Sequence, residues 1–260
     1  MSTNTAGASS APAWESSADI SVEIERTTAN RLTARIGAML FLLGLVVLVV
    51  STQLHPAHEN PMDNPAVFRE YAQSDLWIAV HLGQFLGFLL VVGGLVALYY
   101  SLATSEDAAA AVARFGLAAA VTTGASFTIL QAVDGIALKR AVDAWTSAPP
   151  DQQVAAFAAA EAIRWIEIGV NSLAFSLVGL TLVLYGIALA LSTIYPRWLG
   201  WLAAAAGVAH IIRGVGVSYQ GFVPSIAALI GLALLAVWAV IMAVMMWRRG
   251  NLPAVPTAMG

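Results

Sequence analysis

Six long apolar segments dominate this sequence and leave few ways for it to fold. Each is at least as long as the roughly 20 apolar residues that an α-helix needs to cross a bilayer. We place them at residues 32–54, 76–102, 108–138, 158–191, 198–217 and 222–247. Prolines and charged residues separate them, as at Pro56 and Pro61 after the first segment. The pattern predicts an all-α integral membrane protein, built as a bundle of six transmembrane helices.

The composition excludes several other classes of protein. Of the 260 residues, 59% are hydrophobic and only 10% are charged, whereas soluble domains average about 25% charged residues. The net charge of −3 and the lack of a basic stripe argue against a nucleic-acid partner. The chain has no cysteine, which excludes disulfides, thiol redox chemistry and iron–sulfur clusters. The lipid bilayer is the one partner that the composition indicates.

The chain divides into a membrane domain and two tails. Residues 1–30 are polar and contain no apolar run, which predicts a disordered cytoplasmic tail. Residues 31–249 form the six-helix domain, and residues 250–260 form a short cytoplasmic C-terminal tail. With the N-terminus inside, seven basic residues fall near the inner ends (Arg26, Arg31, Arg35, Arg114, Arg197, Arg248 and Arg249), against three outside (Arg69, Lys139 and Arg140). This bias favours a multi-pass protein with both termini in the cytoplasm.

A short recurring sequence is compatible with three repeated helical hairpins. An arginine followed closely by a glycine opens the first, third and fifth segments, at Arg35-Ile36-Gly37, Arg114-Phe115-Gly116 and Arg197-Trp198-Leu199-Gly200. Recurrence at a fixed structural position is how internal repeats are recognised.

Two stretches resemble a known family. Residues 31–44 read RLTARIGAMLFLLG, and residues 194–200 read IYPRWLG. They resemble the first-helix and late P-R-W-L motifs of a large bacterial family of multi-span inner-membrane proteins, catalogued as a domain of unknown function. The resemblance implies the number of spans and a location in a bacterial inner (plasma) membrane. It implies no reaction, and no catalytic residue can be assigned.

Polar residues lie within or beside the apolar segments, all toward the predicted outer face. Those on one helix are mostly spaced three or four residues apart and therefore share a helix face. The candidate ligand-binding or proton-carrying residues are His81, Gln84, Asp134, Glu161, Arg164, Glu167, Asn171, His210 and Arg213. We expect Arg164 to pair with Glu161 or Glu167, and Arg213 to pair with Asp134.

Several functions are compatible with these residues, because charges inside a span mark solute or proton paths but also serve as contacts between helices. The working hypothesis is a non-enzymatic, outward-facing polar pocket that binds or translocates a small polar solute or a proton, without a cofactor. One alternative is a structural polar belt that has no ligand. Another is a metal-dependent intramembrane hydrolase, with zinc held by His81, Asp134, Glu167 and His210.

The remaining histidine interpretations concern haem and the first loop. Haem between His81 and His210 is a further alternative, although the predicted spans contain only these two histidines. His55 and His58 are three residues apart beside Pro56 and could also bind a metal ion. Because histidines in a loop are more commonly solvated, we interpret both as solvated loop histidines. No oligomeric state follows from the sequence.

Overall fold

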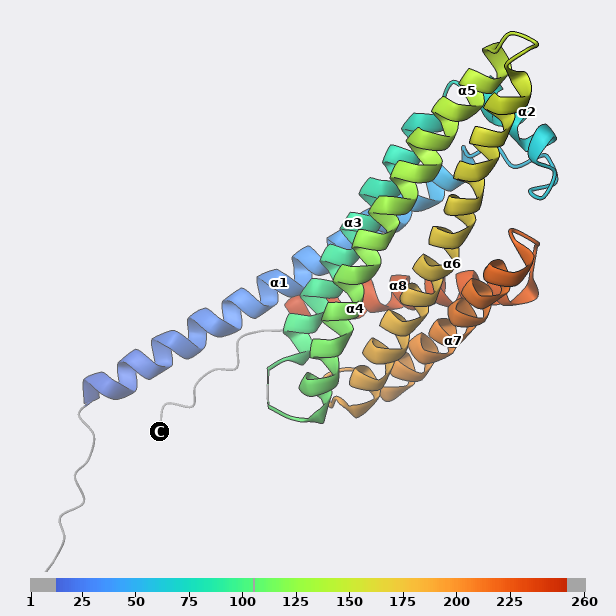
Figure 1. Ribbon diagram of the computed structural model, residues 1–260. Coiled ribbons are helices and arrows are strands. Elements are labelled where there is room, and N and C mark those ends of the chain that lie inside the picture. Colours follow the sequence, from blue (N-terminus) through green and yellow to red (C-terminus); the bar gives the residue numbers. More distant parts are fainter. Residues whose placement is uncertain (1–12, 105, 252–260) are drawn as a thin grey trace, which may run out of the picture.

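The computed structural model describes residues 13–104 and 106–251, with side chains described from residue 28 onward. Every regular element in these residues is helical (Figure 1). The elements are α1 (Ala13–Gln53), α2 (Asn64–Gln73), α3 (Trp77–Leu102), α4 (Ala108–Gln131), the π-helical segment η1 (Ala132–Leu138), α5 (Lys139–Ser147), α6 (Gln153–Leu191), α7 (Arg197–Gln220) and α8 (Ile226–Gly250).

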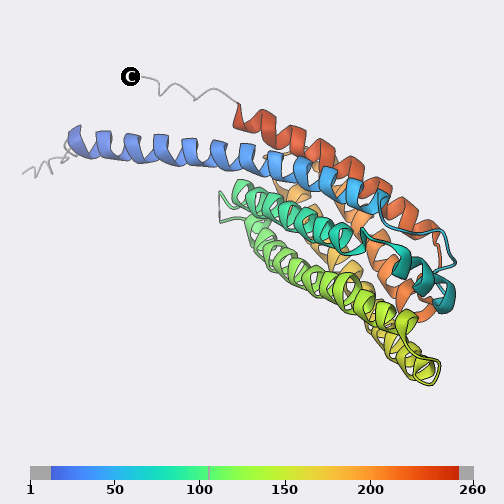
Figure 2. The same ribbon diagram turned by 90° about the horizontal axis from the view of Figure 1, so that it is seen from above.

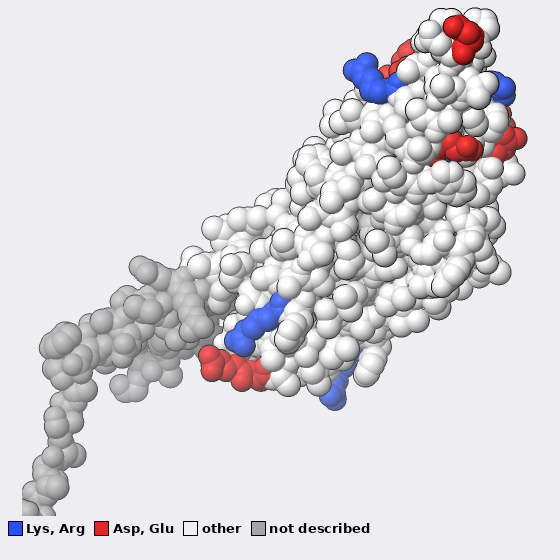
Figure 3. Space-filling view, in the orientation of Figure 1, with Lys and Arg blue, Asp and Glu red and all other residues white. Residues whose placement is uncertain are grey.

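Six helices in the described residues are long and apolar enough to cross a membrane. They are the membrane part of α1 from residue 28, then α3, α6, α7, α8 and the continuous unit of α4, η1 and α5 over Ala108–Ser147. The long helices lie side by side, and α1 extends beyond the bundle (Figure 2). Charged side chains gather at the two ends of the visible face, with a broad uncharged band between them (Figure 3). The predicted fold class is confirmed: the chain is a multi-pass α-helical membrane protein.

The first helix is longer than the sequence predicted. It begins at Ala13, whereas we expected residues 1–30 to form a disordered tail. Residues 1–12 and 252–260, which hold the rest of both predicted tails, lie outside the described residues.

Two further boundaries differ for local reasons. The third span does not end at Leu138, because the π-helical segment carries the helix on into α5. The last span begins at Ile226 instead of Phe222, because the Ser225 hydroxyl caps the helix by accepting a hydrogen bond from the Ala228 amide at 3.2 Å.

The spans contact one another in more ways than three separate hairpins would allow. Consecutive spans pack as α1 with α3, α4 with α6, and α7 with α8. In addition, α6 packs along α7, α1 packs against α8, and α3 packs against α4. The bundle is therefore continuous.

Glycines bring α6 and α7 close together. A Cβ atom added at Gly186 would lie 2.6 Å from the carbonyl oxygen of Gly200, and one added at Gly207 would lie 2.6 Å from that of Gly179. Both distances are too short for a real side chain, so the two backbones touch. Such small-residue seams are a common way for helices to associate in lipid.

The short helix α2 is an element that the sequence analysis did not predict. Asp63 caps it by accepting a hydrogen bond from the Ala66 amide at 3.2 Å. Its apolar face, with Val67, Phe68 and Tyr71, packs against Trp77 and residues of η1, α5 and α6. This small core fixes α2 across one end of the bundle, which we call the α2 end.

Candidate functional site

The predicted site residues gather in the half of the bundle nearest α2, in two groups. The first group, the α2-side cluster, contains His81, Asp134, Arg164 and Glu167, and the structure adds His55 and Tyr71 to it. The second group, the Phe175 cluster, surrounds the ring of Phe175 and contains His210 and Arg213.

His81 is held in one orientation by α3 and η1. Its side chain is buried, with 1% of the residue exposed. The Nδ1–H group donates to the main-chain oxygen of Trp77 at 2.7 Å, because a carbonyl can only accept. Nε2 therefore faces Asp134 Oδ2, 3.1 Å away. A Cβ atom at Gly135 would overlap the His81 side chain, so the glycine allows this close approach.

Asp134 owes its position to the π-helical segment. It lies in the first turn of η1, where hydrogen bonds span five residues instead of four, and such segments are frequent at functional sites. The indole N–H of Trp77 donates to its main-chain oxygen at 3.1 Å. Its carboxylate Oδ1 is buried and has no hydrogen-bond partner among the described residues.

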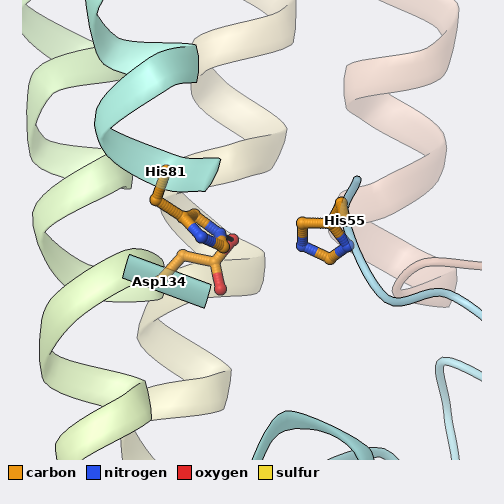
Figure 4. Close-up of side chains that lie close together, drawn as sticks. All are labelled: His55, His81 and Asp134. Atoms are coloured by element: carbon orange, nitrogen blue, oxygen red, sulfur yellow. Dashed lines mark ion pairs between the residues drawn. The ribbon is translucent and has the colours of Figure 1, made fainter. Parts of the chain in front are cut away.

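His55 joins this pair from the segment that follows α1. Its ring lies near that of His81 (Figure 4), with 5.2 Å between the two ring centroids. The centroid of the Trp77 ring is 4.8 Å from that of His55. Burial lowers the pKa of His55 and so favours its neutral form. The interpretation of His55 as a solvated loop histidine is therefore wrong. The same interpretation is confirmed for His58, whose side chain is 90% exposed.

Arg164 and Glu167 form a buried ion pair on α6. Arg164 Nη1 donates to Glu167 Oε2 at 2.7 Å, and each residue is 2% exposed. The same nitrogen lies 3.3 Å from the Tyr71 hydroxyl, and Nη2 donates to the Pro61 carbonyl at 3.1 Å. Arg164 therefore ties α6 to α2 and to the loop before it. Burial raises the pKa of Tyr71, which keeps its hydroxyl neutral.

One of the two predicted ion pairings is confirmed and the other is wrong. The predicted pair of Arg164 with Glu167 is present, while Glu161 accepts a hydrogen bond from Asn64 Nδ2 at 2.9 Å. The predicted pair of Arg213 with Asp134 does not form, because Asp134 faces His81 and Arg213 faces a different side of the bundle.

The Phe175 cluster lies on α6 and α7. The guanidinium carbon of Arg213 lies 3.5 Å from the centroid of the Phe175 ring. His210 is 2% exposed, and its Nδ1–H donates to the Ala206 carbonyl at 2.9 Å. Asn171, one turn before Phe175 on α6, has a buried Oδ1 without a hydrogen-bond partner in the described chain. Gln84 lies half-buried on α3, on the same helix face as His81.

Of the four residues in the alternative metal-ligand set, only His81 and Asp134 belong to a group of ligands that lie close together. The described residues contain one group of at least three ligands whose atoms all lie within 4.8 Å of one another, and it consists of His55, His81 and Asp134. His55 therefore stands where the sequence analysis had named Glu167 and His210. A signal for it was present, because His55 directly follows the first span and Pro56 fixes the chain there.

The architecture and the site define a multi-pass α-helical membrane protein with buried ionisable groups toward one end. The family model described as "Domain of unknown function (DUF4386)" matches residues 36–241. The chain belongs to this family, as the resemblance in its first and fifth spans implied. No curated protein and no solved structure matches the chain.

Proposed function

We propose that the protein lies in the plasma membrane of a bacterium, with both termini in the cytoplasm and the α2 end outside. The distribution of basic residues supports this orientation. Arg31 and Arg35 of α1 lie beside Gly250, at the end of α8 that carries Arg248 and Arg249. Arg114 and Arg197 lie near the starts of α4 and α7. These helix ends lie away from α2 (Figure 1). The α2 end carries Arg69, Lys139 and Arg140, of which Lys139 is paired with Asp143 at 2.8 Å.

We further infer that the polar half of the bundle binds a small organic anion that enters from the α2 end. The observation that carries this proposal is the environment of Arg213. No hydrogen bond or ion pair joins its guanidinium to a described residue, and the guanidinium carbon lies 3.5 Å from the centroid of the Phe175 ring. A cation within a span is costly unless an anion or water balances it. A carboxylate or phosphate group is the natural partner, because a guanidinium binds these groups with two parallel hydrogen bonds.

A groove between α6 and α7 lies one helical turn from Arg213, on the side toward the α2 end. It has a volume of ≈ 510 Å³ and is lined by residues of both helices, including Ser172 and Val217, with Met62 at its rim. Arg213 lies one turn below Val217 on the same face of α7, and Phe175 lies one turn below Ser172 on α6. The groove therefore brings a ligand from the α2 end to within one helical turn of the guanidinium, and the last turn requires α6 and α7 to separate near Gly214.

Anion binding can be measured by the thermal stability of the purified protein. Acetate, benzoate and inorganic phosphate are titrated against a chloride control of equal ionic strength. At least one of them is expected to stabilise the wild type, and Arg213→Gln is expected to weaken that binding by about tenfold or more, the loss of one charge-assisted hydrogen bond.

Arg140→Gln is the matched control, because it removes an exposed arginine at the same end of the bundle. It should bind the anion as the wild type does. Equal loss in both variants would show a general charge effect and contradict the proposal. The absence of any shift beyond that of chloride would favour the structural polar belt.

A further inference from the structure

We propose that His55, His81 and Asp134 bind a divalent transition-metal ion, with zinc the expected one. The site is separate from Arg213 and from the groove between α6 and α7, so it does not rest on the proposed anion binding. Its three ligands come from the segment after α1, from α3 and from η1, which lie far apart in the sequence (Figure 4). Folding alone brings their ligand atoms within 4.8 Å of one another.

The hydrogen bonds of the two histidines leave the ligating nitrogens free. His81 Nδ1–H donates to the Trp77 carbonyl at 2.7 Å, and His55 Nδ1–H donates to the Pro56 carbonyl at 2.6 Å. Because a carbonyl cannot donate, Nδ1 carries the proton in both rings, and Nε2 of each neutral ring has an available lone pair. A backbone carbonyl on the second nitrogen is the usual way in which proteins orient metal-binding histidines.

Two buried polar atoms at this position lack hydrogen-bond partners. In the described part of the chain, neither His81 Nε2 nor Asp134 Oδ1 makes a hydrogen bond, although both are shielded from solvent. His81 Nε2 and Asp134 Oδ2, at 3.1 Å, are already about as far apart as two ligands of one zinc ion. The two atoms form an ion pair only when the His81 ring is protonated. A metal ion would take the place of that proton and bind Nε2 of the neutral ring together with the carboxylate.

The surroundings are compatible with a bound cation. Two neutral imidazoles and one carboxylate supply a single negative charge to a divalent ion. The guanidinium of Arg164, which also belongs to the α2-side cluster, is neutralised by Glu167 at 2.7 Å. The Trp77 ring lies 4.5 Å from His81 and 4.8 Å from His55 and limits the movement of both imidazoles.

The donor set indicates the class of metal and its coordination. Two histidines and a carboxylate bind zinc in many hydrolytic sites, and the same set binds non-haem iron(II). Three protein ligands leave a position for water, which is the arrangement that the hydrolase alternative requires.

The test is the metal content and zinc affinity of the full chain, purified in mild detergent without a histidine tag. We expect about one zinc ion per chain, and a cobalt(II)-loaded sample should show the visible absorption of a low-symmetry, nitrogen- and oxygen-ligated ion. His55→Gln, His81→Gln and Asp134→Asn should each weaken zinc binding by about tenfold or more.

His210→Gln is a closely matched control. His210 is as buried as His81, and its Nδ1–H likewise donates to a carbonyl four residues earlier. It should keep full zinc binding, as should His58→Gln in the first loop. His55 follows α1 and lies in a loop, so His55→Gln keeps the test valid if the two helix variants fail to fold.

Three results would overturn the proposal. They are a wild type that neither retains zinc nor is stabilised by added zinc, a His210→Gln variant that loses as much zinc as His81→Gln, and a folded His55→Gln variant with unchanged zinc affinity. Arg213→Gln should not alter zinc binding, so failure of the metal site and failure of the anion site give different results.

Discussion

Arg164 connects more parts of the α2 end than any other side chain of the α2-side cluster. It reaches Glu167 within α6, the Tyr71 hydroxyl on α2 and the Pro61 carbonyl before α2, and its guanidinium carbon lies 4.7 Å from the Phe222 ring centroid in the loop before α8. A buried charge with these contacts holds four segments in one arrangement. Removal of this charge lowers the stability of the fold by more than the loss of one hydrogen bond would, because Glu167 would remain as an uncompensated buried carboxylate.

We predict that Arg164→Met lowers the free energy of unfolding by about 3–5 kcal/mol. The double variant Arg164→Met/Glu167→Met should recover a large part of that loss, because both charges are then absent. Denaturant unfolding in detergent, monitored by circular dichroism, measures both values. A double variant that is less stable than Arg164→Met alone would show that the unpaired Glu167 carboxylate is not the main cause of the lost stability.

Sequence reasoning found the ion pair that lies on one helix, and its metal alternative grouped His81 with Asp134, but the ion-pair partner that it gave Asp134 was wrong. The three-residue spacing of Arg164 and Glu167 was sufficient to predict their ion pair. The partner of Asp134 was not predictable in this way, because the π-helical segment rotates its side chain away from the face that an α-helical period assigns. Tyr71 was missed because α2 has no apolar run long enough to be recognised as a span.

At the scale of elements, the glycine seam between α6 and α7 is the closest helix contact described above. We predict that Gly207→Leu destabilises the bundle by about 1–3 kcal/mol, because an added side chain would meet the Gly179 carbonyl and Val183. Gly216→Leu is the control on the same helix, since a Cβ atom there meets nothing within 4 Å. Thermal unfolding should separate the two variants. Equal destabilisation would indicate that helix propensity, and not the seam, determines the effect.

The loop before α2 offers a prediction about pH. Burial alone would raise the pKa of Glu70, but hydrogen bonds from the His58 amide at 2.9 Å, its ring at 2.7 Å and the Glu59 amide outweigh it and lower the pKa below the ordinary value of 4.5. A carboxylate with a lowered pKa stabilises the fold above the unfolded pKa, and the contribution disappears as the pH falls through the folded pKa.

We therefore expect the amide protons of residues 58 and 59 to lose protection from exchange as the pH falls below about 4.5. In Glu70→Gln these amides should exchange faster at neutral pH. Lowering the pH should then cause no further loss of their protection. Hydrogen-exchange mass spectrometry of the loop peptide measures this, after correction for the intrinsic pH dependence of exchange. Protection that is equal in the two proteins at pH 7 would contradict the assigned role of Glu70.

The length of the apolar segments was sufficient to predict the six spans, because the bilayer imposes one length and one composition on each of them. They were insufficient for α2, for the continuation through η1 into α5 and for the start of α1 at Ala13. In those regions the start and end of each helix depend on caps such as Asp63 and on tertiary contacts such as those of Phe68. Two residues of the α2-side cluster, Tyr71 and Asp134, lie in these regions, so the sequence predicted the bundle better than it predicted the site.

At the scale of the whole molecule, the ionisable groups are distributed unequally along the bundle. The α2-side and Phe175 clusters occupy the half near α2, whereas the core toward the other end consists of apolar side chains such as Leu98, Leu199 and Met246. Both proposed ligands, the anion and the metal ion, would reach their sites from the α2 end, so the orientation in the membrane decides which compartment supplies them.

The natural absence of cysteine makes this orientation directly testable. We predict that Asp151→Cys, in the exposed turn between α5 and α6 at the α2 end, reacts with a membrane-impermeant maleimide in intact spheroplasts. Glu106→Cys, exposed between α3 and α4 at the opposite end, should react only after the membrane is permeabilised. The wild type provides the unlabelled control. The reverse labelling pattern would place the α2 end in the cytoplasm, in which case the positive-inside bias would not have determined the topology and both sites would draw their ligands from the cytoplasm.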